Sequence, residues 1–269
     1  RFTTYYEYDK TGNLVKQTEP GGAVYTYEYD ALNRLITKKY SDGTNSALLE
    51  SFSYERGGNA DKASKQTNTE YIDSVNKLVT EKFFDYAGRE TVSETQYKRT
   101  EKEYYADGNL KRERVFDKAA DSKCISDVLY FYNDRGMPDI TLTGYKPGES
   151  YFITKNLYTK DGLPEYEIVY TDVQKVDLSS PVIPEKAKAS VTKYEYDESG
   201  NVLKESTLLG EFEIADLSSA KFAVKTEWEY DVTNNTVTEK SGKIKTVYVN
   251  NYLDKTVTVT NIADSADIT

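Results

Sequence analysis

The sequence predicts an all-β fold, built as an array of antiparallel β-hairpins. Three observations support this prediction. A tyrosine-rich motif recurs along the chain, a Gly or Asn follows each copy at a fixed distance, and apolar and polar residues alternate with a period of two. No segment shows a convincing helical stripe of apolar residues.

The motif is Tyr-Glu-Tyr-Asp, which occurs at Tyr6–Asp9, Tyr27–Asp30 and Tyr194–Asp197, with one ring exchanged in a fourth copy at Trp228–Asp231. We call its third residue the anchor. Two successive anchors, Tyr8 and Tyr29, are 21 positions apart, and insertions lengthen other intervals. The same pattern of aromatic strand, turn and second strand places the anchors at Tyr8, Tyr29, Tyr54, Phe84, Tyr104, Tyr132, Tyr158, Tyr196 and Tyr230.

The fourth residue after each anchor is always Gly or Asn, the residue types that most readily take a positive φ. A turn former such as Asp usually comes directly after the anchor, and this order predicts a type I turn closed by a G1 bulge. Glu55 and Tyr105 depart from that rule, so their turns are weaker predictions. The expected turn positions are Gly12, Asn33, Gly58, Gly88, Gly108, Gly136, Gly162, Gly200 and Asn234.

We expect residues 1–269 to form a single repeat array interrupted by insertions near 57–76, 171–192 and 210–222. Two of the insertions contain the sequence Asp-Leu-Ser-Ser, at Asp177–Ser180 and Asp216–Ser219. The Asp of this sequence can cap a helical turn, and a plain surface loop is an equal alternative. Edge strands are expected near Tyr5 and near Val257, where Thr256–Thr260 alternates.

Composition argues against several function classes. A net charge of −10 disfavours nucleic acid as a partner, and no apolar run is long enough to span a membrane. Histidine is absent, and Cys124 therefore has no imidazole partner. No phosphate-binding loop occurs, and nothing singles out one acidic pair from 45 Asp and Glu. We therefore predict no enzyme activity and no cofactor. We also predict no metal site, because turn chemistry accounts for the Asp-rich turns.

Tyr27–Leu35 resembles the aromatic-x-Tyr-Asp-x-x-Gly-Arg-Leu hairpin of the YD-repeat, or RHS-repeat, family and departs from it at Asn33. Tyr6–Leu14 is nearly as similar. The family includes bacterial wall-associated proteins, polymorphic toxins, insecticidal-toxin subunits and teneurins. The resemblance implies a long antiparallel sheet that coils and can close into a hollow shell. Nine hairpins are too few for a large shell, so we expect an extended, curved and open sheet.

The resemblance also implies a function. We expect a non-catalytic structural scaffold, a fragment of a larger bacterial protein that is extracellular or on the cell surface. Its partners would be neighbouring repeats or domains of the same parent protein. The Asp-Pro dipeptides of the family's self-cleaving terminus do not occur. The alternative is a module that binds a surface glycan or a protein at the cell envelope, with Trp228 and Phe222 as binding candidates beside the insertions.

Overall fold

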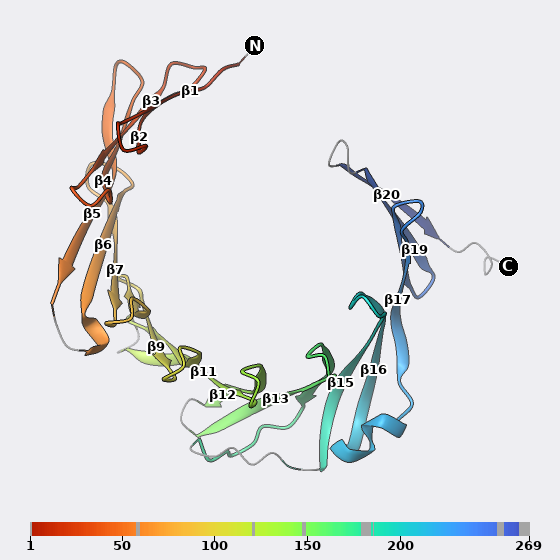
Figure 1. Cartoon of the computed structure of the whole chain (residues 1–269). Helices are drawn as coiled ribbons and strands as arrows, with labels where there is room; N and C mark the ends of the chain where they lie inside the picture. Colours follow the sequence, from red (N-terminus) through yellow and green to blue (C-terminus); the bar gives the residue numbers. More distant parts are fainter. Residues whose placement is uncertain are drawn as a thin grey trace. The chain divides into compact units, whose positions relative to one another are not determined.

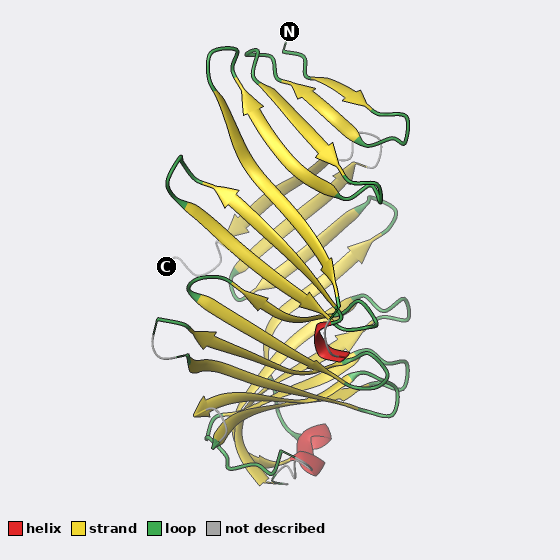
Figure 2. Cartoon of the chain, turned by 90° about the vertical axis from the view of Figure 1, so that its left-hand side faces the viewer, coloured by secondary structure: helices red, strands yellow, loops and turns green. Residues whose placement is uncertain are grey.

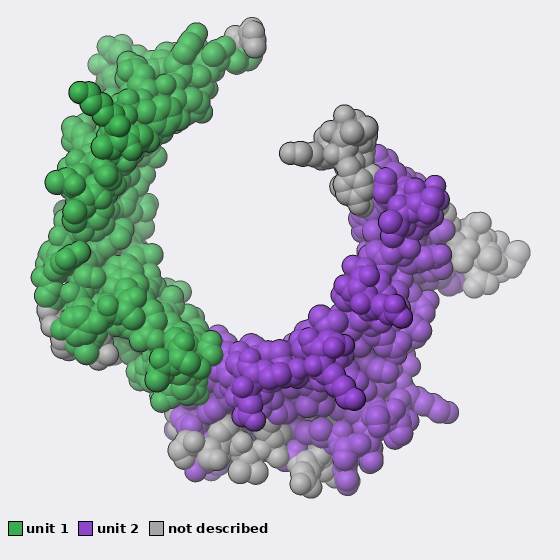
Figure 3. Space-filling view, in the orientation of Figure 1, with its two compact units in different colours: residues 1–127 green, residues 128–269 purple. Residues whose placement is uncertain are grey.

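The computed structural model describes residues 2–57, 60–119, 122–146, 149–178, 184, 186–251 and 256–263. The chain divides into two compact units, residues 1–127 and 128–269, shown in different colours in Figure 3. Each unit consists of β-hairpins, and the only helices in the described ranges are two short 3-10 segments. Neither of these helices has the length or the apolar character that crossing a membrane requires.

Unit 1 is an antiparallel meander in which each strand pairs with its neighbours in the sequence, as Figures 1 and 2 show. Its strands are β1 (Tyr5–Tyr8), β2 (Leu14–Thr18), β3 (Val24–Tyr29), β4 (Leu35–Ser41), β5 (Ser46–Arg56), β6 (Ser64–Tyr71), β7 (Lys77–Phe84), β8 (Glu90–Glu94), β9 (Lys98–Tyr104) and β10 (Leu110–Asp117).

Unit 2 continues the same pattern after β11 (Lys123–Tyr132), which crosses the boundary between the units. Successive strands again pair in antiparallel fashion. They are β12 (Pro138–Lys146), β13 (Ser150–Tyr158), β14 (Pro164–Tyr170), β15 (Lys186–Tyr196), β16 (Val202–Glu213), β17 (Ala223–Asp231), β18 (Thr236–Ser241), β19 (Ile244–Asn251) and β20 (Thr256–Ala263).

The predicted all-β array is confirmed, since the twenty strands form one antiparallel sheet. The sheet is open. Within the described ranges, β1 pairs only with β2 and β20 only with β19. These terminal strands coincide with the edges expected near Tyr5 and Val257.

The main hydrophobic core lies in unit 2. Leu142, Ile153, Ile168 and Val191 come from four neighbouring strands, and each is fully buried. The short helix η2 (Ile214–Ser219) contributes Leu217, which is also buried in this cluster. A sheet with one covered face and one wet face explains the period-two alternation of its strands.

The two Asp-Leu-Ser-Ser sequences place their leucines on this same core. Leu217 belongs to the buried cluster, and Leu178 packs against it from the insertion after β14. Tyr170 also holds that insertion, because its hydroxyl donates a hydrogen bond to the carbonyl oxygen of Pro184 at 3.1 Å. The 210–222 insertion is the end of β16 followed by η2, so a helical turn is observed there. The predicted cap is wrong, because Asp216 lies inside the turn and Glu213 holds the cap position without a side-chain hydrogen bond.

Unit 1 has few buried apolar side chains among the residues described. Val92 and Val115 are buried, and cross-strand ion pairs connect neighbouring strands. Glu90 on β8 pairs with Lys82 of β7 and with Lys102 of β9, at 3.1 and 3.0 Å. Aromatic and β-branched residues pack on the strands between these pairs.

The region near 57–76, expected as an insertion, contains a strand of the sheet. It holds the short helix η1 (Ala60–Lys62) and β6, which pairs with β5 and with β7. The polar composition of β6 concealed it, because Lys65, Asn68 and Glu70 interrupt the apolar alternation of a usual strand.

Candidate functional site: the junctions between repeats

Most of the hairpin turns that follow an anchor share one hydrogen-bond pattern. At the first turn, the amide of Gly12 donates to the carbonyl of Asp9 at 3.2 Å, and the amide of Asp9 donates to the carbonyl of Asn13 at 2.9 Å. The anchor then pairs with the sixth residue after it across a bulge, as Tyr8 does with Leu14. The same two backbone bonds recur in the turns that begin at Asp30, Asp85, Tyr105, Asn133, Thr159 and Asp197.

Positive φ is found at seven of the nine expected turn positions. The values are +89° at Gly12, +60° at Asn33, +79° at Gly88, +98° at Gly108, +74° at Gly136, +89° at Gly162 and +84° at Gly200.

The ninth turn differs from the prediction. Asn235, with φ of +53°, is its left-handed residue in place of Asn234. Tyr230 pairs with Val237 and Asp231 with Thr236, so the loop is one residue longer and has no bulge. The amide of Asn234 instead donates to the side chain of Asp231 at 3.0 Å.

The turn after Tyr54 also departs from the pattern. Gly58 lies outside the described residues, while Gly57 has φ of +120° and donates to the carbonyl of Ala63 at 3.0 Å. Strand β5 continues through Glu55 to Arg56, which makes Glu55 a strand residue. The other weak prediction, at Tyr105, forms the common turn, and there Asp107 accepts the amide hydrogen of Asn109.

In most of these turns, the side chain of the residue after the anchor caps the turn. Asp197 accepts the amide hydrogens of Ser199 and Asn201 at 2.9 and 2.8 Å, and the side-chain amide of Asn201 at 2.8 Å. These bonds lower the pKa of the carboxyl group, with the Asn201 side chain as the largest cause. Asp9 has the same environment, and its pKa falls to about 2, chiefly through the Thr11 hydroxyl. The carboxylates of these turns are therefore occupied as hydrogen-bond acceptors.

Anchor tyrosines join their repeats to the preceding ones. The tyrosine hydroxyl donates to the backbone carbonyl of the sixth residue after the preceding anchor, which is the first residue of the second arm. The bonds are Tyr29 to Leu14 (2.9 Å), Tyr54 to Leu35 (3.0 Å), Tyr104 to Glu90 (2.7 Å), Tyr158 to Pro138 (2.5 Å), Tyr196 to Pro164 (2.7 Å) and Tyr230 to Val202 (3.0 Å). We call this series of bonds the hydroxyl ladder.

At two junctions of unit 1, an arginine side chain lies over the anchor ring. The guanidinium of Arg34 lies 4.1 Å from the ring centre of Tyr54, and that of Arg89 lies 4.8 Å from the ring centre of Tyr104. Each arginine is the fifth residue after the preceding anchor, and each also pairs with the capping Asp of its own turn. An anchor ring therefore offers its face to a cation.

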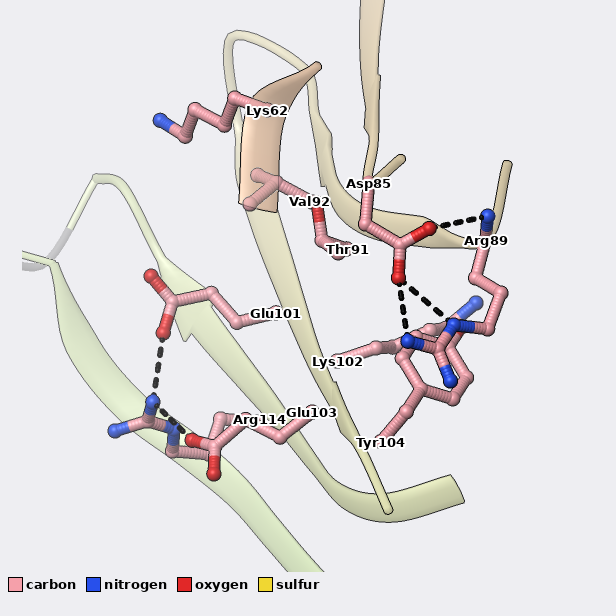
Figure 4. A pocket seen from close by; sticks show the side chains of 10 residues that line it. All are labelled: Lys62, Asp85, Arg89, Thr91, Val92, Glu101, Lys102, Glu103, Tyr104 and Arg114. Atoms are coloured by element: carbon pink, nitrogen blue, oxygen red, sulfur yellow. Dashed lines mark hydrogen bonds and ion pairs between the residues drawn. The ribbon is translucent and has the colours of Figure 1, made fainter. Parts of the chain in front are cut away.

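Figure 4 shows the pocket beside one of these junctions. Asp85 accepts hydrogen bonds from Arg89, while Arg114 bridges the carboxylates of Glu101 and Glu103 at 3.1 and 2.9 Å. Charged groups of both signs line this pocket, and ion pairs hold these residues to one another. It has the character of a surface network of salt bridges, with no converging acid and base.

A second groove, in unit 2, is mainly apolar. Three tyrosines, two prolines and one valine line it together with one amide and one carboxylate: Pro138, Asn156, Tyr158, Pro164, Glu167, Tyr194, Tyr196 and Val202. Burial is the largest cause of the raised pKa of the Tyr194 hydroxyl, and the nearby Glu167 carboxylate adds to it. Sequence reasoning did not single out this groove, because its residues come from five strands.

The two binding candidates are not exposed platforms. Phe222 packs against the core cluster, and its ring centre lies 6.0 Å from that of Tyr166. Trp228 is half-buried on β17 and pairs in register with Glu239. Neither residue lines the apolar groove of unit 2.

Other reactive groups are unremarkable among the described residues. No group of three or more Asp, Glu or Cys has an arrangement that could hold a metal ion. The thiol of Cys124 is half-buried and donates to the carbonyl of Ser126 at 3.3 Å. Burial raises the pKa of this thiol, which disfavours the nucleophilic thiolate.

Comparison with known proteins identifies the motif. Residues 8–44 match the family described as RHS Repeat. The segment is thus similar in sequence to an RHS repeat. The resemblance drawn from Tyr6–Leu14 and Tyr27–Leu35 is thereby confirmed. No curated protein matches the chain.

Two solved structures are distantly similar to the chain. The TcdB2-TccC3-Cdc42 crystal structure is 12% identical, with a TM-score of 0.42, over 98% of this chain and 16% of that one. A Photorhabdus luminescens Tc holotoxin pore is 9% identical, with a TM-score of 0.27, over 98% and 20%. The chain spans about a sixth to a fifth of the length of these proteins.

Proposed function

We propose that this chain is a non-catalytic structural scaffold. The observation that carries the proposal is the hydroxyl ladder, in which six anchor tyrosines between Tyr29 and Tyr230 join their repeat to the preceding one. The recurring side chains thus have structural partners within the sheet. Catalytic groups usually break such local consistency, and no departure of that kind brings an acid and a base together among the described residues.

The exposure of the tyrosines favours the scaffold over a broad binding platform. Tyr5, Tyr6 and Tyr8 are exposed together on the terminal strand β1. The anchors Tyr29, Tyr54, Tyr104 and Tyr230 are half-buried and bonded within the ladder. Rings that recur along a partly covered face are typical of cross-strand packing.

The family that residues 8–44 match supports a proposal for the protein and the location in which this chain acts. We place the chain in a larger bacterial protein that is secreted or displayed on the cell surface, with neighbouring repeats or domains of that protein as its partners. The open strands β1 and β20 are the surfaces on which such neighbours would pair.

A screen for turnover tests the absence of catalysis. The purified chain would be incubated with a panel of glycans and of ester, phosphoester and peptide substrates. We expect no turnover above that of a heat-unfolded sample. Turnover that a single Asp or Glu substitution abolishes, in a variant of unchanged melting temperature, would contradict the scaffold proposal.

A further inference from the structure

The apolar groove of unit 2 has features that the scaffold does not require. Its cavity volume is about 430 Å³, within the roughly 300–1,000 Å³ typical of small-molecule sites. The rings of Tyr158, Tyr194 and Tyr196 all line it, together with the carboxylate of Glu167. No ring pair is formed by these tyrosines in the described structure, so their faces are not occupied by one another.

The polar groups of the groove mainly accept hydrogen bonds. The hydroxyls of Tyr158 and Tyr196 already donate their hydrogen bonds to the backbone carbonyls of Pro138 and Pro164, within the ladder. The carboxylate of Glu167 is an acceptor only, and in the described part of the chain it has no hydrogen bond or ion pair. Such a groove repels anions and leaves one negative charge without a counterpart.

Anchor rings elsewhere in the chain lie against cationic side chains. In unit 1, guanidinium groups lie over Tyr54 and Tyr104, from the fifth position after the preceding anchor. The corresponding residues before Tyr158 and Tyr196 are uncharged, Met137 and Leu163. Across the residues that the structure describes, no cation lies over the ring of Tyr158, Tyr194 or Tyr196.

The rim of the groove is acidic. An adjoining depression shares Tyr194 and Tyr196 and is also lined by Asp161, Glu165, Glu195 and Asp197, with Lys193 as its one basic residue. The ammonium of Lys193 pairs with Glu195 at 3.0 Å. The rim thus keeps a negative excess that would attract a positively charged ligand.

We propose that this groove binds a quaternary ammonium group, such as that of choline. Aromatic faces beside a carboxylate bind such groups through cation–π attraction, and their methyl groups suit an apolar lining. A primary ammonium is more strongly hydrated and would lose more on entering an apolar groove. The proposal is independent of the scaffold function, since the hydroxyl ladder stays intact when the groove is filled.

The test is a calorimetric or NMR titration of the full chain with choline and with its uncharged isostere, in which carbon replaces the ammonium nitrogen. We expect saturable binding of choline and binding of the isostere that is weaker by about fivefold or more. Glu167→Gln should weaken choline binding by a similar factor. Glu211→Gln, on β16 and outside the groove, is the matched control and should leave the affinity unchanged.

Tyr194→Leu supplies a second variant that removes a ring without touching the ladder, and it should also weaken binding at an unchanged melting temperature. Equal affinity for choline and its isostere would overturn the proposal, as would the absence of saturation or full binding by both variants. Saturation by neutral sugars but not by choline would assign the groove to a glycan. Turnover is not measured, so failure here leaves the scaffold proposal standing.

Discussion

The hydroxyl of Tyr104 donates a hydrogen bond to the backbone carbonyl of Glu90, 2.7 Å away and 14 positions earlier in the chain. Glu90 begins the second arm of the preceding hairpin, and Tyr104 ends the first arm of its own. The bond therefore joins two repeats at the base of their turns. A phenylalanine, as at the anchor Phe84, would supply the same ring but could not form this bond.

Tyr104→Phe tests the value of one bond in the ladder. The substitution keeps the ring under Arg89 and removes only the hydroxyl, so we expect a loss of roughly 0.5–1.5 kcal/mol in the free energy of unfolding. Chemical denaturation measures this loss. Tyr86→Phe is the matched control, because Tyr86 is 76% exposed and its change should stay within about 0.5 kcal/mol. Equal effects at both positions would show that the ladder contributes nothing specific.

Gly200→Val tests the turn geometry. Gly200 has φ of +84°, a conformation that opposes a β-branched side chain, so we expect a cost of roughly 1–3 kcal/mol in the free energy of unfolding. The control is Gly210→Val on β16, where no positive φ applies and open space surrounds the added carbon. An unchanged melting temperature for Gly200→Val would contradict the assigned turn.

The capped turns predict sensitivity to acid. Hydrogen bonds lower the pKa of Asp9 to about 2, and that of Asp197 is lowered chiefly by the Asn201 side chain. A carboxyl group whose pKa is lower in the folded state stabilises the fold above its unfolded pKa, near 4, and that stability disappears as the pH falls through the lowered value. We therefore expect the melting temperature to fall between about pH 4 and pH 2.

Asp197→Asn checks this origin. The amide oxygen can still accept the hydrogen bonds of Ser199 and Asn201, but the group no longer titrates. The variant should be less stable at neutral pH and should lose less on acidification than the unchanged chain. Identical pH profiles would show that the turn carboxylates do not cause the acid sensitivity.

The hairpins could be predicted from the sequence because their determinants are local. An anchor, a capping residue and a Gly all lie within five positions, so the turn at Gly12 follows from short-range sterics. The last turn shows the limit of this reasoning. Asn234 and Asn235 can both take a left-handed conformation, and only the strand register decides that Asn235 does so.

Features that join distant segments could not be predicted in this way. The hydroxyl ladder depends on the register between repeats, and the apolar groove gathers Tyr158, Glu167 and Tyr194 from three strands. Strand β6 was missed because its polar residues pair with neighbours without forming an apolar face. A strand defined mainly by its partners leaves a weak signal in its own sequence.

Leu217→Ala tests whether the insertions stabilise unit 2. Leu217 is 2% exposed and brings η2 onto the core beside Tyr166 and Ile168. Removing its buried methyl groups leaves a cavity, so we expect a loss of about 2–5 kcal/mol in the free energy of unfolding.

The matched control is Leu209→Ala on β16, where the side chain is 72% exposed and a change within about 0.5 kcal/mol is expected. If both variants unfold at the same denaturant concentration as the parent chain, η2 is only a surface turn. A loss confined to Leu217→Ala would show that the Asp-Leu-Ser-Ser segment supplies the covering layer that a single sheet lacks.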